Sequence, residues 1–278
     1  MARAISRIDD PGVGNTLIRF NSDIYTVVVD GSNPRRLTDS LGTKGWPSWS
    51  PDGRQIVYRW APEGFDWNRS DIAIVTVADL KVTTLAHEAW SPAWSPNGDW
   101  IAYYSASDRF GLNLIRQDGS DDHQILAGDA EYPAWSPDGR RIAFMSLGFP
   151  AGSSSADYDL YVVDADGRNL QRLTTAAGED GWPAWSHDGG RIAYEHRPTE
   201  AESEIHVMMA DGTMDQRITD PTDVLQESDP SWSPGDGYLV YYASTLTETG
   251  GLFVMRPDGS GRLKVGSDGS DPAWKPEP

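Results

Sequence analysis

The chain of 278 residues contains no cysteine, which excludes disulfide bonds, thiolate metal sites and cysteine nucleophiles. Basic residues are also scarce: 23 lysines and arginines stand against 42 aspartates and glutamates, so the formal net charge is -19. Nucleic acids and anionic membrane surfaces are therefore excluded as partners, because both require a basic surface. No apolar run approaches the roughly 18 residues of a membrane span. The acidic composition instead favours cationic partners.

The amino-terminal residues 1–8 lack the apolar segment of a signal peptide. The sequence as it stands therefore predicts a cytoplasmic protein. A periplasmic or secreted protein is predicted if a signal peptide has been removed.

A proline two residues before a tryptophan recurs six times along the chain. Successive copies are 45, 41, 50, 47 and 42 residues apart, and their tryptophans are Trp49, Trp94, Trp135, Trp185, Trp232 and Trp274. The first four copies continue into a turn with glycine and a short run rich in β-branched and aromatic residues. A period of roughly 40 to 50 residues is the length of one four-stranded propeller blade.

The repeat predicts an all-β fold, a six-bladed β-propeller with four-stranded antiparallel blades. The first blade begins out of phase, with residues 2–9 expected as its second strand, 23–29 as its third and 35–38 as its fourth. Its missing inner strand is expected from residues 272–274, which would close the ring. The prediction is a single domain, 1–278, with blades at 2–38 plus 271–276, 46–86, 91–127, 132–174, 182–219 and 229–265.

One copy of the repeat reads Pro-Ala-Trp-Ser-Pro-Asp-Gly in residues 133–139 and ends on Arg-Leu-Thr at 172–174. This pattern resembles the WD-like repeat of TolB-type propellers, and the resemblance covers essentially the whole chain. Members of that family include periplasmic scaffolds that bind proteins, substrate-gating domains of serine peptidases, and a few lyases and hydrolases. The chain has no Gly-x-Ser-x-Gly motif, so the resemblance does not imply a peptidase.

The long connections of each blade are predicted to lie on one face of the propeller, and the short turns on the other. Binding residues usually lie on long loops of a rigid scaffold, and the six motif tryptophans are expected to pack between blades. On the long-loop face we predict a ligand site made of Trp46, Trp60, Trp67, Trp90, Tyr132, Trp182, His87 and Arg197. The alternative is that the tryptophans of this set pack beneath the loops.

Acidic residues also precede most of the inner strands. By sixfold geometry they converge on the mouth of the central channel, where they concentrate cations and could hold Ca²⁺ through oxygen ligands. The candidate metal ligands are Glu131, Asp180, Asp229 and Asp271. The alternative is that these carboxylates accept backbone hydrogen bonds from neighbouring loops.

Together these features predict a binding propeller that requires no cofactor and whose channel mouth favours a cationic or metal-bridged ligand with aromatic stacking. The partner is expected to be a small molecule, a sugar, a peptide or another protein, and the chain is expected to be a monomer. The alternative is a hydrolase or lyase that acts on a carbohydrate or a small natural product at the same mouth. Its acid–base candidates are His196, Glu195, Glu131 and Asp180.

Overall fold

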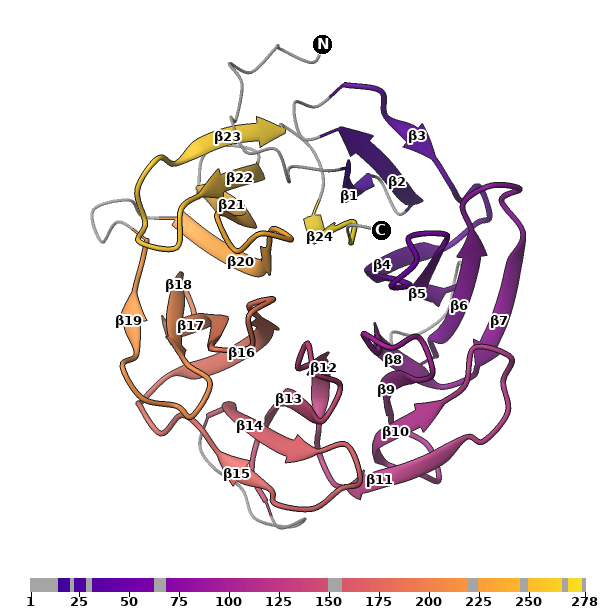
Figure 1. Ribbon diagram of the computed structural model, residues 1–278, viewed down its shortest axis with the longest axis horizontal. Coiled ribbons are helices and arrows are strands. Elements are labelled where there is room, and N and C mark those ends of the chain that lie inside the picture. The colour runs from indigo at the N-terminus through magenta and orange to yellow at the C-terminus, as the bar shows by residue number, and fades with distance from the viewer. Residues whose placement is uncertain are drawn as a thin grey trace.

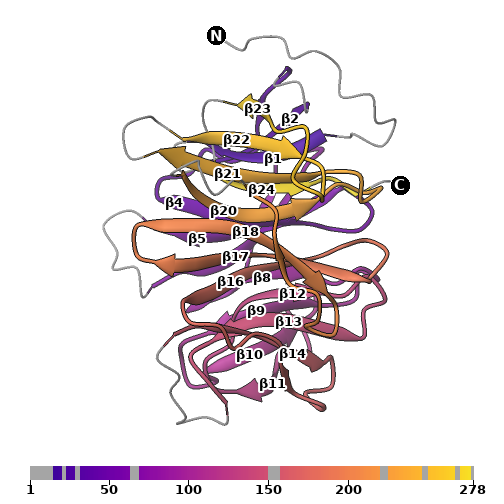
Figure 2. The same ribbon diagram turned by 90° about the vertical axis from the view of Figure 1, so that its left-hand side faces the viewer.

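The structure, a computed structural model, describes residues 15–20, 23–28, 32–62, 69–149, 157–219, 225–245, 250–266 and 270–276. The described strands form six four-stranded antiparallel sheets around one axis (Figure 1). In the view at right angles, the strands of the sheets run from one face of the ring toward the other (Figure 2). The predicted all-β propeller with four-stranded antiparallel blades is therefore confirmed.

The strands of each sheet follow one another from the axis to the rim. The first sheet contains β24 (Ser270–Trp274), β1 (Asn15–Phe20), β2 (Asp23–Val28) and β3 (Arg35–Arg36). The second contains β4 (Thr43–Trp49), β5 (Gln55–Ala61), β6 (Asp71–Thr76) and β7 (Val82–Ala86), and the third β8 (Ala89–Trp94), β9 (Ile101–Ser105), β10 (Gly111–Ile115) and β11 (His123–Ala127). The fourth contains β12 (Glu131–Trp135), β13 (Arg141–Ser146), β14 (Asp159–Asp164) and β15 (Gln171–Arg172), and the fifth β16 (Glu179–Trp185), β17 (Arg191–Thr199), β18 (Glu202–Met209) and β19 (Gln216–Arg217). The sixth contains β20 (Leu225–Trp232), β21 (Leu239–Thr245), β22 (Gly251–Met255) and β23 (Leu263–Gly266).

The first sheet combines strands from both ends of the described chain. β24 pairs with β1 through Thr16↔Trp274 and Leu17↔Ala273, as expected for the closing strand. The prediction that residues 2–9 form the second strand of this sheet was wrong, because β1 forms that strand. Residues 2–9 lie outside the described residues. Only residues 21 and 22 separate β1 from β2, so the strand belongs to the hairpin directly before β2.

The motif tryptophans pack between neighbouring sheets, as predicted. Trp49 of β4 is buried in one cluster with Ile24 and Leu37 from the region of the first sheet. The indole N–H groups also link sheets, since Nε1 of Trp232 donates to the carbonyl of Ala184 at 3.0 Å. These side chains are therefore part of the scaffold that positions the inner strands.

A buried lysine joins the second sheet to the first. Lys44 of β4 is 1% exposed, and its Nζ lies 3.2 Å from Oδ1 of Asp23 in β2. Nζ also donates to the carbonyls of Ser40 and Gly42, while Arg36 donates to Asp23 at 2.5 Å. A charge taken out of water needs such partners, so this cluster stabilises the junction at which the two chain ends meet.

The turns between the first and second strands form a layer that we name the short-turn face, made of residues 50–54, 95–99, 136–140, 186–190 and 233–237. Neighbouring turns contact each other: a Cβ added to Gly98 would lie 3.3 Å from Pro51 of the preceding turn. His187 replaces this proline in the fifth sheet, and its backbone N–H donates to Asp236 of the next turn at 2.7 Å. We name the opposite side, which carries the connections between second and third strands, the loop face. In the part of the chain that the structure describes, no helix is long and apolar enough to cross a membrane.

Candidate functional site

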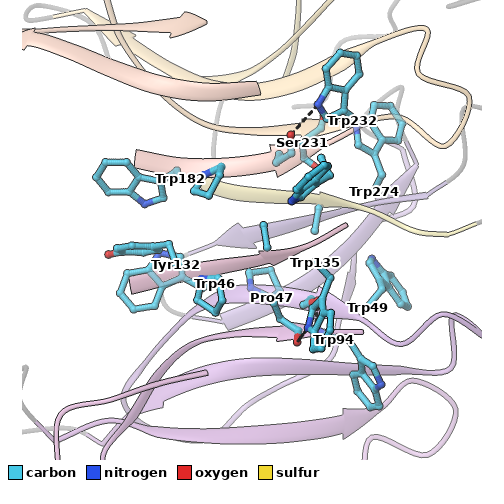
Figure 3. A pocket seen from close by; sticks show the side chains of 18 of the residues that line it. Trp46, Pro47, Trp49, Trp94, Tyr132, Trp135, Trp182, Ser231, Trp232 and Trp274 are labelled. Carbon is cyan, nitrogen blue, oxygen red and sulfur yellow. Dashed lines mark hydrogen bonds between the residues drawn. The ribbon is translucent and has the colours of Figure 1, made fainter. Parts of the chain in front are cut away.

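A cavity of about 590 Å³ lies along the axis between the inner strands β4, β8, β12, β16, β20 and β24. Its wall consists largely of prolines and small residues of the repeated motif, such as Pro47 and Ala93. Figure 3 shows Trp46, Tyr132 and Trp182 at one end and motif tryptophans toward the other. The lining at the short-turn face is supplied by Pro51, Pro96, Pro137, His187 and Pro276.

Each inner strand contains an irregularity just before its motif proline. In β16, pairing with β17 runs through Gly181↔Glu195 and resumes at Ala184↔Ala193, so the register shifts between them. Trp182 lies in this gap and has a φ of 51°. The residue before the motif proline has a φ between 47° and 54° in all six inner strands. We name these six residues, all of which line the cavity, the bulge ring: Trp46, Ser91, Tyr132, Trp182, Asp229 and Asp271.

Three members of the bulge ring are aromatic and contact one another. The ring centroids of Trp46 and Tyr132 are 5.2 Å apart in an edge-to-face arrangement, and those of Tyr132 and Trp182 are 5.0 Å apart. Two guanidinium groups hold the outer rings, because Arg59 lies 4.9 Å from the centroid of Trp46 and Arg197 lies 4.8 Å from that of Trp182. All three aromatic side chains remain partly exposed.

The next two members of the bulge ring are carboxylates on adjacent inner strands, Asp229 of β20 and Asp271 of β24. Burial, and then the nearby charge of Asp271, raise the pKa of Asp229 well above its ordinary value. Both carboxylates also raise the pKa of Tyr132, although burial is the main cause of that shift. The bulge ring is thus divided into an aromatic side and an acidic side.

The backbone of the bulge ring is a poor environment for large side chains. A positive φ places Cβ close to the following carbonyl and costs about 1–2 kcal/mol for an ordinary residue. Aspartate tolerates this conformation better than most residues, so the scaffold alone accounts for Asp229 and Asp271. It does not account for Trp46, Tyr132 and Trp182, because bulky residues are disfavoured there.

Only part of the ligand site predicted from the sequence lines the cavity. Trp46, Tyr132 and Trp182 do so, but they belong to the inner strands rather than to loops, because pairing continues past the bulge. Trp60 of β5 donates from Nε1 to the carbonyl of Leu41 at 2.9 Å.

The other predicted ligand residues differ in their surroundings. Trp90 of β8 contacts Tyr104, with ring centroids 6.0 Å apart, and Trp67 lies outside the described residues. His87 is largely exposed on the loop face, 3.0 Å from Asp71. Arg197 reaches the site indirectly, by stacking on Trp182.

The predicted acid–base residues form buried pairs instead of one site. Nδ1 of His196 lies 2.7 Å from Oδ1 of Asp180, and this hydrogen bond raises the pKa of His196. Burial raises the pKa of Glu195 to about 7, although its ion pair with Arg197 opposes the shift.

Glu131 lies apart from the other acid–base candidates, within 3.4 Å of the Tyr158 hydroxyl. Burial and the charge of Asp129 raise its pKa to about 7. No group of three or more histidine or acidic side chains among the described residues is arranged to hold a metal ion. The four candidate calcium ligands therefore do not assemble there, and calcium binding stays a prediction.

Ser91 and His187 are among the cavity residues that the sequence analysis did not predict. Ser91 completes the bulge ring in β8, and its place directly before a motif proline was the available signal. His187 lies at the short-turn end of the cavity, where it was interpreted only as a replacement for a turn proline.

The fold and the axial cavity define a propeller with a ligand-accessible centre. The sequence pattern of the TolB beta propeller domain matches residues 77–223, which is just over half of the chain. The chain therefore belongs to the TolB β-propeller family. A comparison with curated proteins finds no match.

Solved structures show the same fold at low sequence identity. TolB from Acinetobacter baumannii superposes with a TM-score of 0.77 and 21% identity over 95% of this chain, and this chain spans 66% of its length. A putative TolB from Agrobacterium tumefaciens superposes with a TM-score of 0.75 and 20% sequence identity, and the match covers 94% of each chain. The tricorn protease superposes with a TM-score of 0.69 and 15% sequence identity. The match covers 92% of this chain and 26% of the tricorn protease chain.

Proposed function

We propose that this chain is a protein-binding propeller that receives an extended segment of its partner in the axial cavity. The proposal takes the six sheets as six blades of one ring, closed by the pairing of β24 with β1. Such a ring holds the inner strands in fixed positions. The side chains of the bulge ring can therefore differ between proteins with this scaffold and can serve to recognise a partner.

The observation that carries the proposal is the presence of Trp46, Tyr132 and Trp182 at positions where the backbone disfavours bulky residues. Strain of this kind is retained when another interaction compensates for it. Partly exposed aromatic rings in a cavity offer flat contact area at a low cost in conformational entropy. A ligand in contact with these rings is therefore the simplest compensation.

The chemistry of the ring favours a partner segment that carries positive charge. Asp229 and Asp271 face the same cavity as the aromatic rings, and a cation can interact with both. The net charge of -19 steers a basic partner toward the chain at long range. A protein segment suits the cavity better than a small ligand does. Much of the cavity wall consists of prolines and small residues, which offer few polar groups to fix the orientation of a small ligand.

The alternative of a hydrolase or lyase has no comparable support. Its acid–base candidates form separate buried pairs, and none of the four lines the cavity among the described residues. Catalysis requires these groups within hydrogen-bond reach of one substrate, whereas their hydrogen bonds and ion pairs hold them away from the cavity lining.

The proposal is tested by fluorescence anisotropy with pools of random hexapeptides labelled with fluorescein. The parent chain should bind pools enriched in lysine and arginine, and Trp182→Asn should weaken this binding about tenfold or more. Trp100→Asn is the matched control, since Trp100 is also partly exposed and stacked by an arginine, Arg116 at 4.3 Å, but does not line the cavity. Equal binding by the parent and Trp182→Asn, or no binding of any pool to the parent, would contradict the proposal.

A further inference from the structure

The cavity has two unlike ends. Toward the short-turn face its lining continues to the turns themselves, at Pro51, Pro96 and Pro137. Toward the loop face the lining stops at the bulge ring, and the described residues directly before that ring, such as Gly45 and Glu131, are not part of it. Among the described residues the lining therefore extends to the short turns at one end, which we take as the open end, and to the bulge ring at the other, which we take as the closed end.

Aromatic side chains reach across the axis at the closed end. Trp46 comes from the second sheet and Tyr132 from the fourth, yet their rings are in contact. The third sheet lies between them and contributes Ser91, whose small side chain leaves room for this contact. Trp182 of the fifth sheet extends the same layer from Tyr132, so the three rings form a layer at this end of the cavity, which we name the floor (Figure 3).

The remaining edge of the floor is acidic. Asp229 and Asp271 occupy it, and Glu195 lies beside it as the cross-strand partner of Gly181, the residue before Trp182. Glu195 is fully buried, and its Oε2 has no hydrogen-bond partner among the described residues. The other oxygen of this carboxyl group is paired with Arg197, and the charge of Glu195 contributes to the raised pKa of Asp229, so Glu195 belongs to the acidic edge of the floor.

A blind cavity admits the end of a chain more readily than its middle, because a continuous strand has no exit. The six residues from Trp46 of β4 to Pro51 of the following turn span roughly 17 Å when extended, so about five residues of an extended partner fit between the short turns and the floor. A carboxyl terminus would meet like charge at that depth, whereas an amino terminus brings an ammonium group to carboxylates and aromatic faces. We infer that the cavity binds the free amino terminus of a partner protein, which enters from the short-turn face and places its α-ammonium group at Asp229 and Asp271.

This inference rests on the proposed function, and its test separates the two. The probes are random hexapeptide pools without lysine or arginine, labelled with fluorescein at the carboxyl end, so that the α-ammonium group is the only cation. The pool with a free amino terminus should bind at least about 30-fold more tightly than the same pool after Nα-acetylation, because acetylation removes the charge that pairs with partly buried carboxylates. Double substitution Asp229→Asn with Asp271→Asn should abolish the difference, while Asp211→Asn with Asp258→Asn, at exposed turn aspartates, should preserve it.

The direction of entry has its own test, because the chain has no cysteine and a single one can be introduced for labelling. A polyethylene glycol maleimide attached to Arg54→Cys, at an exposed short-turn residue outside the cavity lining, should block binding of the free-amine pool, and the unlabelled variant should bind normally. The same label on His87→Cys, on the loop face, should leave binding unchanged. Blocking at position 87 and not at 54 would overturn the inferred entry.

The remaining outcomes are also decisive. Equal affinity for free and acetylated pools would overturn the amino-terminal inference, yet would leave the proposed function standing if Trp182→Asn still lost binding. Absence of binding by every pool, including those with lysine and arginine, would overturn both.

Discussion

Two tryptophans three residues apart on β16 allow a direct test of which aromatic residues are scaffold and which belong to the site. Trp185 is a motif tryptophan, 7% exposed and buried in the cluster between the fourth and fifth sheets. Trp182 is a bulge-ring residue with a φ of 51° and a partly exposed side chain. The perturbation is the same for both, a change to asparagine, which accepts positive φ and removes the indole.

The expected losses of stability differ severalfold. Trp182→Asn removes the contact with Tyr132, about 0.5–1.5 kcal/mol, and the stacking of Arg197, about 0.5–1 kcal/mol. It also removes packing of the partly exposed indole against the edge of the cluster between the fourth and fifth sheets, about 1 kcal/mol, and relieves roughly 1 kcal/mol of backbone strain, so the net loss is about 1–2 kcal/mol. Trp185→Asn empties a buried site, which costs about 3–5 kcal/mol, and adds a buried amide without designed partners.

Equilibrium unfolding in urea, followed by far-ultraviolet circular dichroism, measures both free energies of unfolding. The difference between the two variants should be about 3 kcal/mol, with Trp185→Asn the less stable variant. Equal destabilisation by the two changes would refute the reasoning, because Trp182 would then be core and its strained backbone would need no ligand to explain it.

Two further predictions concern buried charge. Lys44→Met should lower the free energy of unfolding by about 3 kcal/mol, because it removes a positive charge beside Asp23 and leaves two carbonyls without a donor. Urea unfolding measures this loss, with Lys81→Met as the control at an exposed lysine. Equal losses in the two variants would contradict a role of Lys44 in the junction between the first and second sheets. The pKa of Asp229 is raised in the folded state by burial and by Asp271, so the stability that its neutral form contributes is present below about pH 4 and is lost as the pH rises through the folded-state pKa. Asp229→Asn should therefore have the same melting temperature as the parent near pH 4 and a higher one near pH 8. A melting temperature below that of the parent at both pH values would show that the ionised carboxylate of Asp229 stabilises the fold.

The repeat carried most of the information about the fold. The spacing of the Pro-x-Trp copies locates the inner strand of every sheet, and the orphan copy around Trp274 locates the closing strand. The position of β1 could not be found in the same way, because its segment lacks the motif and residues 2–9 have a similar β-forming composition. Hairpin pairing with β2 decides between them, and pairing is not visible in composition.

The site was predicted only in part, for a geometric reason. Trp46, Trp90 and Trp182 all stand shortly before a motif proline and look equivalent in the sequence. Trp46 and Trp182 stand directly before their motif prolines, at the bulge, and face the cavity. Trp90 stands two residues before its proline and contacts Tyr104 instead. A shift of one residue exchanges the faces of a strand, which makes this distinction depend on backbone conformation.

The acidic residues were grouped too broadly for the same kind of reason. Asp180 is close to the bulge ring in sequence, and Glu195 is brought close to it by cross-strand pairing with Gly181, but their side chains are paired with His196 and Arg197. Sixfold symmetry brings equivalent positions to the axis, and among the described residues on this side the lining includes the position directly before each motif proline but not the position before that. Asp229 and Asp271 fulfil that condition and are the carboxylates retained in the proposed site.

Fluorine NMR of the chain labelled with 5-fluorotryptophan tests the central claim most directly. The signals of Trp46 and Trp182, assigned by single replacement with phenylalanine, should shift when a selected free-amine hexapeptide is added, because both indoles line the floor of the cavity. The signals of Trp60, Trp90 and Trp100 should stay in place, since these side chains lie outside the cavity lining. Shifts of Trp60 and Trp90 with unchanged signals for Trp46 and Trp182 would contradict the account and place the ligand outside the cavity.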